Sequence, residues 1–269
     1  MDRTLSAVLV VLVVVSAAFL VVISLTAYIG ITYRGTLSST YEYRVSIAPD
    51  AAIGNVTLYL PIPSRGAGNS AILGEIGAGN LRGLPPGWNM SLIGTEKFTM
   101  LEITAREIAP APVGEPYLLT VRARVPGPIE TRNAGSADLV LAPTAAGRPS
   151  TCGDTGPQVS PEVHCEAYEA PVYADYTAGS PVRLSIFLFL DGKNGWDVFG
   201  PSSNEYQDGL QVTWSGGARG WQPGKGLLVT GIGDYGLDFW VQGPGGVTPH
   251  PGGSRLPARW TPGPGGEIA

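Results

Sequence analysis

The first 34 residues constrain this chain most, because they contain a long apolar run without charge. No residue between Arg3 and Arg34 is charged, and Val, Leu, Ile, Ala and Phe dominate the interval. An α-helix needs only about 20 such residues to cross the hydrocarbon layer of a bilayer. The run Leu9–Val15 has no polar stripe, which a helix packed in a soluble core would show. The sequence therefore predicts an N-terminal transmembrane helix over residues 1–34.

Retention of this helix depends on whether a signal peptidase cleaves it. Small residues at Ser16–Ala18 and at Leu25–Ala27 offer cleavage sites. The apolar region of a signal peptide normally runs about 7–15 residues, which is shorter than this run. Cleavage after Ala18 would also leave the apolar segment Phe19–Ile23 at a new N-terminus in water. We therefore expect a retained signal anchor with membrane lipid as its partner, and a cleaved signal peptide is the alternative.

Two kinds of site favour an extracytoplasmic position for the rest of the chain. Asn55 and Asn89 each begin an Asn-X-Thr/Ser sequon, so both are predicted glycosylation sites. Cys152 and Cys165 can close a short disulfide loop, a bond that persists in oxidising compartments. The basic residues that flank the helix are nearly balanced and do not decide its orientation. We therefore predict a single-pass membrane glycoprotein with its C-terminal domain outside the cell membrane.

The composition after the helix favours an all-β domain. The chain has 38 glycines and 24 prolines among 269 residues, well above their usual combined share of about 12%. Between these turn residues, apolar side chains alternate with polar ones, as in half-buried strands. Val182–Leu190 is apolar on both faces, which is typical of a central strand in a β-sandwich, Ig-like or jelly-roll-like. Strands are predicted at residues 41–47, 56–60, 88–93, 98–105, 117–125, 138–142, 182–190, 210–214 and 227–232.

The predicted domain organisation follows from changes in composition along the chain. A short linker at 35–39 precedes a β-sandwich domain at 40–242. Within it, residues 66–87 are predicted to form an extended loop with one short strand, and 143–179 a polar insertion that contains both cysteines. Residues 243–269 are rich in Gly and Pro and are expected to stay disordered, because they bury too little apolar surface.

The motif search predicts no catalytic residue and no cofactor. Gly231–Gly236 matches G-x-G-x-x-G, but no helix that could bind a pyrophosphate is predicted after it. The two histidines, His164 and His250, lie in the insertion and the tail, and no G-x-S-x-G accompanies them. A formal charge of -5 also argues against a broad basic surface for nucleic acid.

No metal site is predicted either. Cys152, His164 and Cys165 lack the paired C-x-x-C spacing of zinc ligands, so a disulfide is favoured. An expected loop carries three oxygen ligands, Asp191, Asn194 and Asp197, but their spacing is not that of an EF-hand. Such residues are ordinary turn formers.

Tryptophans in the last third of the chain are the predicted contacts for a ligand. Trp214 is in line with Leu210 and Val212 and is therefore predicted to be in the core. Trp196 and Trp221 lie near glycines in expected loops, so we predict that they are exposed and contact a ligand. Side by side, two such rings would suit the apolar face of a sugar.

Several segments resemble membrane-anchored surface proteins of archaea, a group without an assigned activity. The resemblance is carried by Tyr41–Arg44, Asn55–Pro63, Pro85–Trp88 and Asn204–Tyr206. It implies an extracytoplasmic placement and brings no catalytic or binding residue.

Together these features predict a membrane-anchored extracytoplasmic β-domain with a structural or interaction role at the cell envelope, and not an enzyme. Three alternatives stay open: a glycan-binding or adhesion module, a pilin-like filament subunit, and a membrane-tethered hydrolase with an unrecognised site. The expected partners are membrane lipid and another envelope protein or a glycan.

Overall fold

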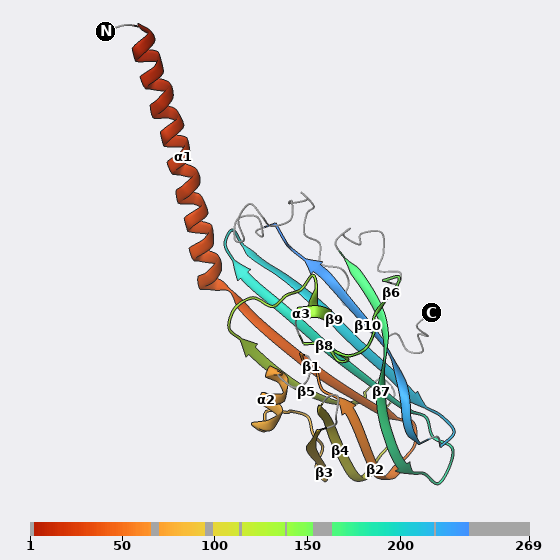
Figure 1. The fold of residues 1–269 in the computed structure, drawn as a ribbon. Helices are drawn as coiled ribbons and strands as arrows, with labels where there is room; N and C mark the ends of the chain where they lie inside the picture. Colours follow the sequence, from red (N-terminus) through yellow and green to blue (C-terminus); the bar gives the residue numbers. More distant parts are fainter. Residues whose placement is uncertain are drawn as a thin grey trace.

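The computed structural model describes residues 3–65, 70–94, 99–112, 115–137, 139–152, 163–217 and 219–236. A long helix leads into one antiparallel β-sheet with two short helices (Figure 1). The predicted Gly/Pro-rich tail at 243–269 lies outside the described residues.

Helix α1 (Arg3–Thr36) confirms the predicted N-terminal apolar helix. By length and composition it could cross a membrane, as an anchor or as a signal sequence. Only Leu37 separates it from β1 (Ser38–Pro49), so the last helical turn and the first strand residues occupy the linker predicted at 35–39. The Leu37 N–H donates to the Tyr33 carbonyl at 2.8 Å, which continues the helical pattern up to the strand. The domain therefore follows the helix without a flexible spacer.

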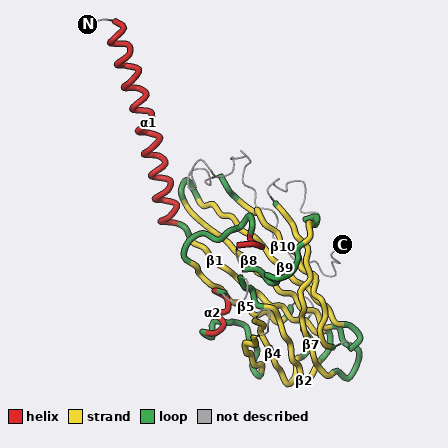
Figure 2. Tube along the Cα trace, viewed as in Figure 1, coloured by secondary structure: helices red, strands yellow, loops and turns green. Residues whose placement is uncertain are grey.

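The described strands all belong to one sheet, in the order β3-β4-β2-β7-β10-β9-β8-β1-β5, with β6 beside β7. The sheet curves strongly into a half-barrel (Figures 1 and 2). The all-β prediction is confirmed, but one continuous sheet stands where two sheets of a sandwich were expected. The strands are β1 (Ser38–Pro49), β2 (Ile53–Pro61), β3 (Trp88–Gly94), β4 (Thr99–Ile108), β5 (Tyr117–Val125), β6 (Arg148–Pro149), β7 (His164–Thr177), β8 (Leu184–Asp197), β9 (Pro201–Trp214) and β10 (Gly220–Gly233).

The core lies on the concave face of this sheet. Successive strand residues point to opposite faces, and one face of each long strand is buried. The Tyr43 hydroxyl of β1 donates to the Pro61 carbonyl of β2 at 2.9 Å, although four strands separate β1 from β2 in the sheet. Curvature therefore brings distant strands together, so a single sheet buries its own apolar face. Trp214, predicted as a core residue, is fully buried there.

Helix α2 (Ala71–Gly77) corrects the prediction of an extended loop with one short strand at 66–87. The Ser70 side chain caps the helix by accepting a hydrogen bond from the Leu73 N–H at 3.2 Å. Ile72 and Ile76 lie one turn apart and are both buried in the core. The flanking glycines masked this spacing in the sequence. A second short helix, α3 (Ala134–Ala137), lies in the segment over the concave face.

Strand β7 corrects the prediction of a polar insertion at 143–179. His164–Thr177 forms a strand between β2 and β10, in the middle of the sheet. Alternate residues Ala170, Val172 and Ala174 are buried, but they are small and carried a weak hydrophobic signal. By contrast, the described part of the strand predicted at 138–142, residues 139–142, forms an isolated bridge between Val140 and Ser64.

Candidate functional site

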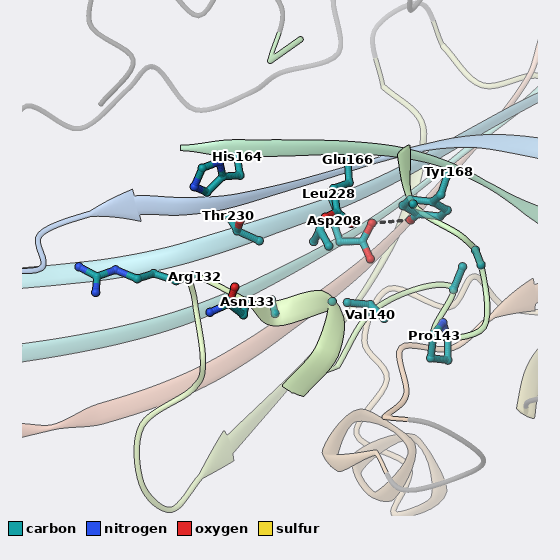
Figure 3. Close-up of a pocket in the computed structure, with 15 residues that line it drawn as sticks. Arg132, Asn133, Val140, Pro143, His164, Glu166, Tyr168, Asp208, Leu228 and Thr230 are labelled. Carbon is teal, nitrogen blue, oxygen red and sulfur yellow. Dashed lines mark hydrogen bonds between the residues drawn. The ribbon is translucent and has the colours of Figure 1, made fainter. Parts of the chain in front are cut away.

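A cavity of about 430 Å³ opens over the sheet and is the candidate functional site (Figure 3). Strands β7, β9 and β10 form its floor. Parts of residues 129–137 and 139–147, which we call the covering segment, form its other wall. Its lining contains apolar, polar, acidic and basic side chains. The lining residues are Arg132, Asn133, Ala134, Gly135, Val140, Ala142, Pro143, Ala145, Gly147, His164, Glu166, Tyr168, Asp208, Leu228 and Thr230.

The cavity lies where the apolar core gives way to polar side chains along β9. Leu210, Val212 and Trp214 on the buried face of this strand belong to the hydrophobic core. In the same alternation, Asp208 and Asn204 follow toward the other end of the strand and are also buried. Polar side chains on this face need hydrogen-bond partners, and the covering segment supplies one partner to each of these two residues.

Asp208 binds the covering segment to the sheet. Its Oδ2 accepts a hydrogen bond from the Leu141 N–H at 2.7 Å, and its Oδ1 accepts one from the Tyr168 hydroxyl. Burial raises the pKa of Asp208 to about 6, and these two hydrogen bonds act against that rise. Tyr206, on the same strand as Asp208, donates a hydrogen bond from its hydroxyl to the Leu139 carbonyl of the covering segment. Both oxygens of the carboxylate at the cavity floor are therefore engaged in holding the fold.

Asn194 of β8 makes a second connection to the covering segment. Its Oδ1 accepts from the Ile129 N–H and its Nδ2 donates to the Ile129 carbonyl, both at 2.8 Å. The same amide donates to Asn204 Oδ1 and accepts from the Ser39 hydroxyl, again at 2.8 Å. One buried amide thus joins strands β1, β8 and β9 to the chain above them.

Four further polar residues of the lining are exposed or half-buried. His164 and Glu166 are exposed and project from β7, while Arg132 and Asn133 come from the opposite wall (Figure 3). Within the described residues, no group of three or more His, Cys, Asp or Glu side chains could hold a metal ion. The arrangement offers donors and acceptors to a small polar ligand.

A second surface feature is a row of three aromatic side chains, Tyr59, Tyr173 and Trp221, which we call the aromatic row. Tyr173 lies directly opposite Tyr59 across β2 and β7 and opposite Trp221 across β7 and β10. Ring centroids are 5.0 Å apart for Tyr59 and Tyr173 and 5.2 Å apart for Tyr173 and Trp221. Trp221 is 54% exposed. The rings form a partly exposed apolar strip on the outer face of the sheet.

The two tryptophans predicted as ligand contacts lie apart. Trp221 is exposed as expected, but Trp196 is 5% exposed, with its ring 5.6 Å from that of Tyr33 in α1. Trp196 pairs with Ser202 beside the β8–β9 turn, whereas Trp221 follows the turn at the opposite end of β9. The expected exposure of Trp196 is therefore wrong, because helix α1 covers it.

The sequence analysis did not identify Tyr59 and Tyr173 as neighbours of Trp221. Tyr59 and Tyr173 occupy the outward positions of strands whose inward residues are buried. That alternation was the available signal, but the strand neighbours that align the rings cannot be read from one sequence.

The other predicted residues take positions set by the strands. Cys152 and Cys165 form the predicted disulfide, which ties the chain before β7 to its second residue. Asn55 is exposed in β2 and Asn89 is exposed in the edge strand β3. The turn predicted around Asp191 and Asp197 is instead the second half of β8, because the strand continues to the end of the hairpin.

The glycine motif 231–236 lies at the end of β10 and just after it. Gly231 and Gly233 have φ values of 80° and 107° at the end of β10. No helix follows them within the described residues, which continue to Gly236.

No family model, no curated protein and no solved structure matches this chain.

Proposed function

We propose that this chain is a membrane-anchored extracytoplasmic domain with a structural or interaction role at the cell envelope, acting by binding and not by catalysis. The observation that carries the proposal is the rigid junction between α1 and the sheet. Ile29 is 2% exposed where it packs with Trp196 of β8 and with Val198 just after that strand. The Asp197 N–H donates to the Thr36 hydroxyl at 3.0 Å. Because the helix and the domain pack as one unit, retention of the helix would hold the domain against the membrane surface.

The disulfide and the sequons support the outside position. The Cys152–Cys165 bond would persist only in an oxidising compartment. Asn55 and Asn89 are both exposed, so both are accessible to a glycosyltransferase. Glycan occupancy of these two residues belongs to this proposal.

Cysteine labelling in intact cells tests the placement. Full-length protein with Trp221→Cys should react with a membrane-impermeant maleimide, whereas Thr4→Cys should react only after the cells are permeabilised. The native cysteines should react only after reduction, which makes the unmodified chain the control. Labelling of Thr4→Cys alone in intact cells, or release of the full-length chain from membranes by alkaline carbonate, would overturn the proposal.

A second candidate function, glycan binding, is favoured by the aromatic row. Three adjacent rings on one face, with Trp221 half exposed, suit stacking on the apolar faces of consecutive sugar rings. Binding of the full chain to soluble polysaccharides would test this, with Trp221→Ala as the test variant. Leu118→Ala is the matched control, because Leu118 is 50% exposed on a different strand, β5. Loss of binding only in Trp221→Ala would support the candidate, and absence of binding by the unmodified chain would overturn it.

A further inference from the structure

The turn between β8 and β9 carries an exposed aromatic side chain beside the apolar helix. Phe199 at this turn is 70% exposed, and Tyr28 of α1 is 53% exposed. Their ring centroids lie 6.4 Å apart. Figure 1 shows the β8–β9 turn at the end of the sheet that meets α1. The residues that join the strands, Val198–Gly200, carry no charge.

The turn is fixed relative to the helix by buried contacts. Ile29 and Tyr33 lie one helical turn apart and pack on Trp196 and Val198. Farther along the helix, Thr36 bonds with the backbone of Asp197. The position of Phe199 is therefore set by the same contacts that orient the whole domain on α1.

The depth of Phe199 follows from its place beside Tyr28. Arg34 is the first charged residue after the apolar run, and a charged side chain is expected at or beyond the membrane interface. At a rise of 1.5 Å per residue, Tyr28 lies about 9 Å farther along the helix toward the hydrocarbon layer than Arg34. Ile31, between them, is 73% exposed. This is the depth at which aromatic side chains gather in membrane proteins, and Phe199 lies level with it.

We propose that the β8–β9 turn enters the membrane interface beside α1, with Phe199 in contact with the lipid bilayer. This inference rests on the proposed anchoring by α1. The domain is then held to the bilayer at two points, the helix and the turn. Two contacts restrict the tilt of the domain, and they direct the aromatic row, at the opposite end of β9 and β10, away from the lipid.

Site-directed fluorescence labelling of the full chain tests the contact. The chain, with its native disulfide intact, is reconstituted in vesicles of phosphatidylcholine and phosphatidylglycerol. The environment-sensitive probe NBD is attached at Phe199→Cys, at Val14→Cys inside the apolar run, and at Trp221→Cys on the aromatic row. We expect blue-shifted emission and quenching by nitroxide-labelled lipid at the first two positions. The Trp221→Cys label should emit as in water and resist that quenching.

The controls separate this inference from the anchoring itself. If the Val14→Cys label reports lipid and the Phe199→Cys label reports water, the contact of the turn is overturned while the anchor stands. If both report water, the anchor fails as well. A label at Pro201→Cys, compared with and without Phe199→Asp, tests whether the native phenylalanine or the probe drives insertion. Emission of this label should shift to the red with Phe199→Asp, and an unchanged spectrum would contradict the proposal.

Discussion

The ring of Tyr168 on β7 lies directly over Gly226 on β10. The two residues are paired across the strands, and a Cβ atom at Gly226 would overlap the aromatic ring. Tyr206 on β9 has the same relationship to Gly192 on β8. An aromatic ring over a strand glycine covers the backbone that the missing side chain leaves open. These two tyrosines also hydrogen-bond with Asp208 and Leu139, so the glycines give them the room to hold the covering segment.

Replacement of Gly226 should therefore weaken the attachment of the covering segment to the sheet. We expect Gly226→Ala to lower the free energy of unfolding by about 2 kcal/mol, because the Tyr168 ring must move away from Asp208. Gly195→Ala is the matched control, since a Cβ on that strand glycine would meet its nearest atoms only at 4.0 Å. Urea unfolding of the full chain in detergent micelles, followed by tryptophan fluorescence, measures both. Equal destabilisation by the two variants would contradict this account.

Among the buried amide side chains, we expect Asn194 to contribute most to the free energy of unfolding. Asn194→Ala removes four hydrogen bonds and leaves the Ile129 backbone and Asn204 without these partners. We expect a loss of about 3 kcal/mol in the free energy of unfolding. Asn89→Ala, at an exposed position of edge strand β3, should change it by less than about 0.5 kcal/mol. The comparison uses the same urea titration, and a small effect of Asn194→Ala would show that water replaces the amide.

Asp191 should make the domain less stable at high pH. Burial raises the pKa of this carboxyl from 3.8 to about 7, and the charge of Glu205 adds to the rise. Lys193 and Arg44 lower the pKa in part, and Glu42 raises it slightly. The folded chain thus binds this proton more tightly than the unfolded chain does. The stabilisation from protonated Asp191 is complete below about pH 4 and is lost as the pH rises through about 7.

The variant Asp191→Asn removes that dependence. It should be more stable than the unmodified chain by roughly 2–4 kcal/mol at pH 8, and the difference should vanish near pH 4. Thermal unfolding of both chains across this pH range, followed by circular dichroism, gives the difference directly. A difference that grows as the pH falls would reverse the sign and refute the argument.

The disulfide should stabilise the start of β7. Cys152 and Cys165 are 13 positions apart, and the bond joins the segment before β7 to the sheet. In the chain-entropy model a loop of this size contributes about 3 kcal/mol. Reduction of the unmodified chain should lower its unfolding midpoint, while the double variant Cys152→Ser and Cys165→Ser should not respond to reductant. A midpoint insensitive to reduction would show that β7 is held by its strand neighbours alone.

The strand segments follow largely from local patterns in the sequence. Alternation at residues 117–125 predicted β5 with its observed bounds, because outward Arg122 and Arg124 contrast sharply with inward Val121 and Ala123. The same rule failed at β7, whose inward residues include small alanines, and at α2, whose two isoleucines lie among glycines. Local patterns identify a strand or helix only when its buried residues are large, apolar and numerous enough to show the periodicity.

The amino-acid sequence alone determined that an apolar helix precedes a turn-rich β-domain with one disulfide, because length, charge and period-two alternation are local properties. Only the tertiary structure decided which strands are neighbours, and with them the cavity, the aromatic row and the burial of Trp196. Strand order places Tyr173 between Tyr59 and Trp221, and the packing of α1 on β8 covers Trp196. These contacts join residues far apart in sequence, so they depend on the curvature and register of the whole sheet.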